Sequence, residues 1–71
     1  MKDLKGQFGK RIKTLRKQKR MTQEQLAEAS NISVDFLSLV ERGKSGPSFE
    51  VLERLAGALG VPVKDLFDFD R

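Results

Sequence analysis

Apolar residues recur along this chain every three or four positions, and short polar breaks interrupt the pattern. Near the N-terminus this spacing places on one helix face the residues Leu4, Phe8, Ile12 and Leu15. Lysines and arginines occupy most positions between them. The spacing predicts a first helix that begins at about residue 4 or 7 and ends at residue 18. Gly6 and Gly9 leave its start open, because glycine weakens a helix interior.

Capping residues predict a second helix after this basic segment. Thr22, followed by Gln25 three residues later, is typical of a capping box, in which each side chain binds the other residue's backbone N–H. The helix is expected to run through Ala29, with Leu26 and Ala29 facing the core. Its start is therefore predicted with more precision than that of the first helix.

A third helix follows after a break at residues 30–32. Ser33 is its predicted N-cap, and Asp35 lies in its first turn, where a negative charge suits the helix dipole. Gly43 is the residue expected to end it, since helices commonly stop at a glycine in the left-handed conformation. The apolar residues of this helix are too many for one buried face, so some of them are expected to lie outside the core.

Two more helices are predicted in the C-terminal part. Ser48 can cap a fourth helix, Gly60 can end it, and between them an apolar stripe is formed by Leu52, Leu55, Ala56 and Leu59. Pro62 suits the first position of a short fifth helix. No alternating strand pattern occurs. We therefore expect a single all-α domain of five helices that spans residues 1–71.

The composition restricts the function. The chain has no cysteine and no histidine, which excludes a disulfide and removes the commonest metal ligand and general base. No glycine-rich phosphate loop is present, and the carboxylates are scattered, so neither an enzyme nor a cofactor or metal site is predicted. No apolar run could span a membrane. No small-molecule site is evident, and a cytoplasmic, nucleoid-associated location is expected.

Charge is divided unevenly along the chain. Residues 1–20 hold nine Lys or Arg and one Asp (+8), whereas residues 21–71 hold five Lys or Arg and nine Asp or Glu (−4), which together give the net +4. A basic segment of this kind suits an anionic partner, either nucleic acid or a membrane surface, or forms only a solvated face. Charge alone does not choose between these.

Two short helices joined by a tight turn, as predicted for residues 22–42, are the helix-turn-helix arrangement. The stretches "RIKTLRKQKRMTQEQLAEASNIS" and "FLSLVERGKSGPSFEVLERLAGALGV" and the closing "DLF" resemble Cro/phage-repressor-type (xenobiotic-response-element-like) transcriptional regulators of prokaryotes and phages. The resemblance covers about residues 8–67. It implies a dimer, repressor-like in action, that lays its third helix in the major groove of double-stranded DNA while the second helix crosses the backbone.

The resemblance also implies which residues meet the bases. It assigns base contacts to Gln23, Ser33, Val34, Asp35, Ser38 and Leu39. Relatives usually carry Gln, Arg, Lys, Thr or Asn at positions 33, 34, 35 and 39, so this chain departs from the pattern. Either Val34 and Leu39 contact thymine methyl groups while Asp35 accepts from a cytosine amine, or this edge is buried against protein and DNA contact is secondary.

Other residues are implied to touch the DNA backbone or to hold the fold. Backbone contacts are expected from Arg16, Thr22, Arg42, Lys44, Ser45 and Ser48. Arg16 and Glu41 match an ion pair that joins the first helix to the end of the third. The dimer interface is expected at Val63, Leu66 and Phe69, with Phe67 closing the core instead.

A second class of function remains open from the sequence. Domains of this type also serve as antitoxins or as modules controlled by a partner protein, and the apolar third helix and the "LFDFDR" tail could bind such a regulatory partner. Binding to specific DNA predicts a steep salt dependence and a twofold symmetric footprint. A role restricted to protein binding predicts neither.

Overall fold

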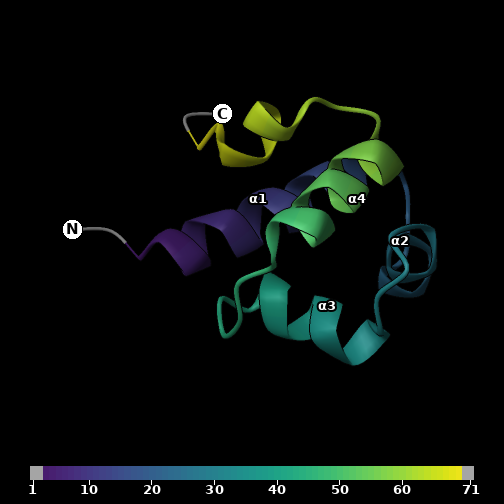
Figure 1. The fold of residues 1–71 in the computed structure, drawn as a ribbon, viewed down its shortest axis with the longest axis horizontal. Coiled ribbons are helices and arrows are strands. Elements are labelled where there is room, and N and C mark those ends of the chain that lie inside the picture. Colours follow the sequence, from purple (N-terminus) through teal and green to yellow (C-terminus); the bar gives the residue numbers. More distant parts are fainter. Residues whose placement is uncertain (1–2, 70–71) are drawn as a thin grey trace.

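The chain forms a series of short helices, shown in Figure 1 from a computed structural model that describes residues 3–69. They are α1 (Leu4–Gln18), α2 (Gln23–Ala29), α3 (Val34–Glu41), α4 (Phe49–Leu59) and the 3-10 helix η1 (Val63–Phe67). No strand occurs within that range. The predicted all-α class is therefore confirmed.

The predicted count of five α-helices is not confirmed, because the last segment is a 3-10 helix. Val63–Phe67 has only five residues, and Pro62 is its N-cap rather than its first residue. A segment this short can close few of the i→i+4 hydrogen bonds of an α-helix. The tighter i→i+3 pattern is common in such short connecting pieces.

The helix starts follow the predicted capping residues. The Thr22 hydroxyl accepts from the backbone N–H of Gln25 at 3.0 Å, and the Thr22 N–H donates to Oε1 of Gln25 at 2.9 Å. The hydroxyls of Ser33 and Ser48 each accept from the N–H three residues further on, at 3.0 and 3.2 Å. These bonds satisfy backbone donors that have no partner inside a helix.

Each of the four α-helices ends at a residue in the left-handed conformation. At the end of α3, Gly43 has φ +76° and donates to the carbonyl of Val40, while Lys44 donates to the carbonyl of Leu39. This pair of bonds is the Schellman motif. The other three helices end in the same way at Arg20, Asn31 and Gly60. Such sharp stops let the chain reverse within a few residues.

The helices surround one apolar core. In Figure 1, η1 lies above α1 and α4, α3 lies below them, and α2 packs at one end. All five elements contribute to the core, which consists of Phe8, Ile12, Leu15, Leu26, Ala27, Leu37, Val40, Val51, Leu52, Leu55, Ala56, Leu59 and Leu66. The prediction that Ala29 faces inward is wrong. Ala27 is buried in its place, because α4 packs against the side of α2 that carries Leu26 and Ala27.

Candidate nucleic-acid interface

The unit formed by α2, a tight turn and α3 is held rigidly by the core. Leu26 on α2 and Leu37 and Val40 on α3 are completely buried, so the two helices share one apolar seam. Arg54 of α4 donates from Nε to the carbonyl of Ser30 in the turn, at 2.8 Å. This contact, which the sequence did not reveal, ties the turn to the rest of the domain.

The outer side of α3 carries small and apolar residues. Ser33 and Asp35 are exposed, Val34 is 38% exposed, and Ser38 and Leu39 are half-buried. Phe36 instead packs against the core. The structure therefore brings together on one exposed edge the α3 residues that were expected to face bases. No lysine or arginine lies between Val34 and Glu41 to reach guanine.

A buried network joins α1, α2 and the end of α3. The Arg16 Nε lies 2.7 Å from Oε2 of Glu41, and its Nη2 donates to Oε1 at 3.1 Å. The remaining nitrogen, Nη1, donates to the carbonyl of Met21 at 2.8 Å. The side chains of Arg16 and Glu41 are only 10% and 2% exposed. All three guanidinium nitrogens of Arg16 therefore bind protein groups. For this reason we leave Arg16 out of the proposed contacts with DNA phosphates.

The same carboxylate orients Gln23 at the start of α2. The Gln23 Nε2 donates to Oε1 of Glu41 at 3.0 Å. Its own Oε1 therefore faces away from Glu41, with its position set by the network. The first turn of α2 also presents backbone N–H groups, a favourable environment for a phosphate. Thr22 has already engaged its hydroxyl in the capping box.

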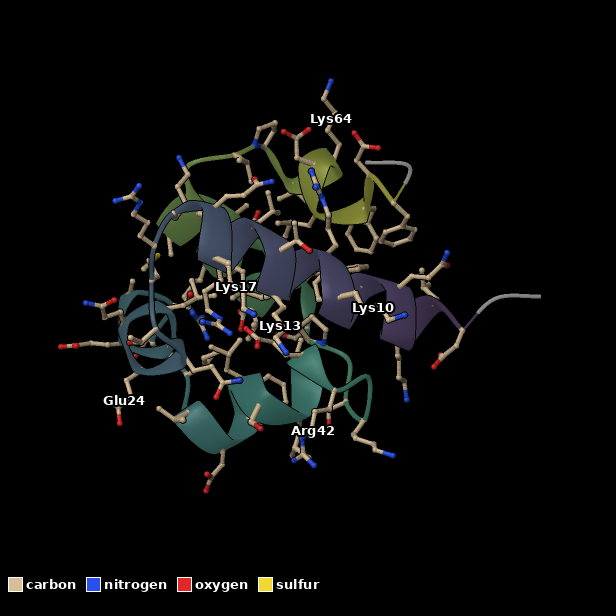
Figure 2. All side chains as sticks on the ribbon, turned by 180° about the vertical axis from the view of Figure 1, so that it is seen from behind. Lys10, Lys13, Lys17, Glu24, Arg42 and Lys64 are labelled. Atoms are coloured by element: carbon tan, nitrogen blue, oxygen red, sulfur yellow. The ribbon has the colours of Figure 1, made fainter. Side chains whose placement is uncertain are left out.

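Positive charge borders α3 on two sides. Arg42 and Lys44, directly after α3, are exposed. Figure 2 shows Arg42 at the end of α3 and a row of lysines, Lys10, Lys13 and Lys17, along the neighbouring side of α1. Ser45 is half-buried, and Ser48 is exposed with its hydroxyl engaged in capping α4. The basic N-terminal segment therefore lies beside α3.

The C-terminal residues expected at a dimer interface differ in their exposure to solvent. Val63 is 38% exposed, whereas Leu66 is fully buried and is available only to the core. Phe69 packs against the core, and Phe67 is 39% exposed. Neighbouring positions on a helix point in different directions, so the inward position of Leu66 turns Phe67 toward the surface, over Phe8.

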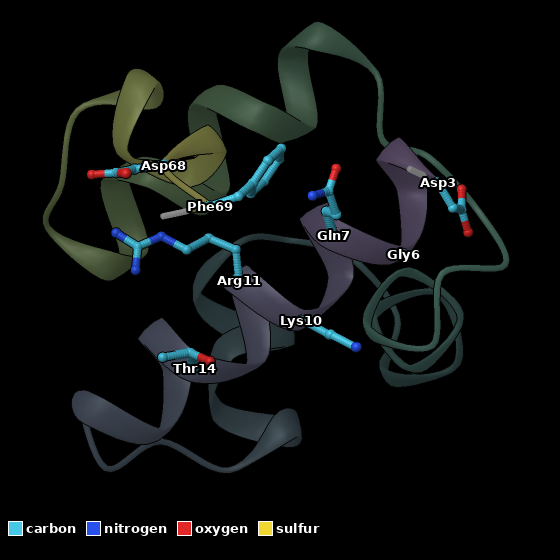
Figure 3. A pocket seen from close by; sticks show the side chains of 8 residues that line it. All are labelled: Asp3, Gly6, Gln7, Lys10, Arg11, Thr14, Asp68 and Phe69. Atoms are coloured by element: carbon cyan, nitrogen blue, oxygen red, sulfur yellow. The ribbon is translucent and has the colours of Figure 1, made fainter. Parts of the chain in front are cut away.

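Phe69 also borders an open hollow of about 500 Å³ between α1 and the end of η1. Figure 3 shows its lining, which includes Gln7, Lys10, Arg11 and Asp68. Arg11 is already tied to the other wall, since its Nε donates to the carbonyl of Asp65 at 2.8 Å. Both acidic and basic residues line this hollow, and none of its lining residues belongs to α3.

A buried helix-turn-helix seam, an exposed edge on its second helix and a basic helix beside that edge define a DNA-binding domain. The chain belongs to the helix-turn-helix family, whose pattern matches residues 12–66. Within residues 3–69 there is no group of three or more His, Cys, Asp or Glu that could hold a metal ion. In the same range, no helix has the length and apolar character needed to cross a membrane.

Similar proteins include a repressor, a transcriptional regulator and control proteins. The chain is 49% identical over 55 residues to the immunity repressor protein of Bacillus phage phi105, a match covering 78% of this chain and 38% of that protein. It is 35% identical over 68 residues to the control protein C.MunI of a Mycoplasma species, covering 94% and 92%. The crystal structure of the restriction-modification controller protein C.AhdI from Aeromonas hydrophila has a TM-score of 0.87 at 35% identity, covering 89% and 96%.

These matches confirm the resemblance to Cro and phage repressors. They also support DNA-binding regulation of transcription as the family's function. The chain spans less than half the length of the phage repressor and of a regulator from Deinococcus deserti, and nearly all of C.MunI.

Proposed function

We propose that this chain binds double-stranded DNA sequence-specifically as a repressor-like twofold dimer, with α3 in the major groove and α2 across the backbone. The observation that carries the proposal is the exposed edge of α3, held in place by the buried seam with α2 and flanked by Arg42 and the lysines of α1. A DNA partner also implies a location with the chromosome, in the cytoplasm.

Base recognition would rest mainly on apolar and uncharged contacts. Val34 and Leu39 would meet thymine methyl groups, and Ser33 and Ser38 would donate or accept at base edges. Asp35 would accept from a cytosine amine and stay clear of phosphates, which would repel it. Gln23 would add a contact through its Oε1, oriented by Glu41.

Backbone contacts would fix the position of the domain on DNA. Arg42, Lys44 and Ser45 lie just beyond α3, and backbone amides open α2 next to Thr22 and α4 next to Ser48. Each neutralised phosphate releases counterions and steepens the salt dependence of binding.

The test of this function is selection of bound duplexes from a random DNA pool at near-physiological salt. We expect enrichment of a palindrome with half-sites about one turn apart, ~34 Å, since twofold dimers read symmetric sites. Binding without enrichment, lost as salt rises, would contradict sequence-specific recognition. A search for a protein bound to α3, as in an antitoxin, would then follow.

Leu39→Ala is expected to change the base preference of the domain. Removing the side chain would delete a thymine-methyl contact and lower the preference for thymine at one position of each half-site by about 1 kcal/mol, the value of burying roughly one methyl group. Competitive binding to duplexes that differ at single base pairs would measure this. Loss of helicity with an unchanged preference would place Leu39 in the fold instead of the groove.

Arg42→Ala is expected to reduce the salt dependence of binding. The slope of log K against log salt concentration should become shallower by about 0.9, the effect of one phosphate contact on B-DNA. Lys64→Ala is the matched control, because it removes the same charge from the opposite side of the molecule (Figure 2). Equal slopes for the two variants would mean that Arg42 contacts no phosphate and contributes only to the overall positive charge of the protein.

A further inference from the structure

One large apolar side chain of the described residues stands almost entirely in solvent. Phe49, the first residue of α4, is 86% exposed, although Val51 and Leu52 on the same helix are buried. The core of the domain therefore does not use this ring. Single exposed apolar residues are common, but this one stands beside a hollow that is itself apolar.

The hollow lies at the end of the molecule where α1 and α4 begin. It has a volume of about 230 Å³, and its lining includes Leu4, Phe8, Pro47, Leu52 and Phe67 in addition to Phe49 itself. Leu4 is 55% and Phe67 39% exposed. An apolar cavity of about 150 Å³ can bind benzene, so this hollow has room for a phenylalanine ring.

We propose that two copies of the domain pair through this end, with the Phe49 ring of each copy in the hollow of the other. A projecting ring next to a hollow of suitable size is self-complementary, which a twofold interface requires. The proposal rests on the dimer of the proposed function and names the face that forms it. Neither Leu66 nor Phe69 takes part.

The dimensions of the domain agree with this arrangement. Its longest axis measures 33 Å, and Figure 1 shows α3 near the middle of that axis and the start of α1 at one end. Two copies that meet at this end have their centres at most about one axis length apart. A twofold axis at this contact therefore allows the two α3 helices to lie on one side of the dimer with a separation near that of a DNA turn, ~34 Å.

Charge on the two halves of the contact is complementary. Lys5 lines the hollow, whereas Glu50 and Glu53 are exposed on α4 next to Phe49. Glu53 lies one turn beyond Phe49 on the same side of the helix. A Phe49 ring that enters the hollow of a second copy brings this acidic border to that copy's Lys5, which favours this partner over an apolar surface of another kind.

The apolar area at this contact is smaller than that of a stable interface. One phenylalanine accounts for about 150–250 Å² when buried, and Leu4 and Phe67 add less. A stable interface buries roughly 800 Å² on each partner. We therefore expect a dimer that dissociates at about micromolar concentrations and is strengthened on palindromic DNA.

Sedimentation equilibrium over a range of concentrations, without DNA, tests the interface. Phe49→Ala is expected to raise the dimer dissociation constant by about tenfold or more, as truncation of a central aromatic residue does. Its circular dichroism and thermal unfolding should match the parent chain, since the ring lies outside the core. Val63→Ala truncates another exposed apolar side chain, on η1 and outside the hollow, with 38% exposure against 86% for Phe49. It is the control and should leave the dissociation constant unchanged.

Other results would overturn the proposal. A parent chain that stays monomeric at high concentration would exclude this dimer. An unchanged dissociation constant in Phe49→Ala would place the interface elsewhere, and weakening by Val63→Ala alone would place it on η1.

DNA binding is measured separately from dimerisation. If the proposal holds, Phe49→Ala still binds a single half-site as the parent does, but loses affinity for the full palindrome. A parent chain that dimerises through Phe49 yet binds no DNA would contradict the proposed function and leave the interface standing.

Discussion

Glu41→Gln is expected to lower the free energy of unfolding by about 3–5 kcal/mol, the usual effect of removing one partner from a buried ion pair. The Arg16 guanidinium would remain in a site where its side chain is only 10% exposed, without the carboxylate that accepts two of its hydrogen bonds. Small domains have a total stability of only about 5–15 kcal/mol, so much of it would be lost. Urea unfolding followed by circular dichroism at neutral pH measures the change.

The double variant Arg16→Met/Glu41→Leu is the control for this substitution. Removing both charges also removes the cost of burying them. The stability of the double variant should therefore be closer to that of the parent chain than the stability of Glu41→Gln is. A loss below about 1 kcal/mol for Glu41→Gln is the value of an exposed pair. That result would show that water reaches Arg16 and that the network does not hold α3 against α1.

Gly9→Ala is expected to destabilise the domain by about 2 kcal/mol. A Cβ at this position would contact the carbonyl oxygen of Val40 and would lie 2.7 Å from that of Glu41. Both are backbone atoms in the last turn of α3 and cannot rotate away, so the two helices must separate. Because the contact is this close and involves backbone atoms, we take the upper end of the usual overpacking cost, about 3 kcal/mol. The higher helix propensity of alanine, about 1 kcal/mol, offsets part of it.

Gly57→Ala provides the matched comparison within α4. A Cβ there would meet nothing within 4 Å. The same substitution should therefore stabilise the domain by about 0.5–1 kcal/mol, through helix propensity alone. Thermal unfolding of the two variants side by side should move in opposite directions. Equal shifts would mean that α1 and α3 do not cross as closely as the structure has them.

Gly9→Ala also bears on the candidate site, because α1 and the end of α3 meet at this glycine. Displacement of α3 would change the position of Arg42 and of the exposed edge. We expect the folded fraction of this variant to bind selected DNA more weakly than the parent chain, whereas Gly57→Ala binds as the parent does.

The sequence predicted the local structure of the domain with good precision. Thr22, Ser33 and Ser48 were identified as helix caps, and Gly43 and Gly60 as helix ends. These features depend on hydrogen bonds between residues a few positions apart and on the conformational freedom of glycine, which a single sequence displays. The exception was the last helix, where five residues after Pro62 were too few to distinguish an α-helix from a 3-10 helix.

The candidate site was predicted in part. The edge of α3 with Val34 and Leu39 followed from its position outside the core stripe and from the family resemblance. The contact between Gln23 and Glu41 could not be predicted, because the two residues lie 18 positions apart and their distance depends on how α2 meets α3. The same applies to Arg54, which reaches the carbonyl of Ser30 across 24 positions.

The sequence by itself determined the four α-helices, their caps and the basic N-terminal segment, because these follow from local bonding and periodicity. The class of protein followed from the resemblance of its motifs to those of a known family. Only the tertiary structure decided which apolar residues stay outside the core. Leu66 is buried, and Phe49 projects into solvent beside a hollow formed by α1, α4 and η1. Periodicity shows that a residue is apolar, but its exposure depends on which distant element packs against it.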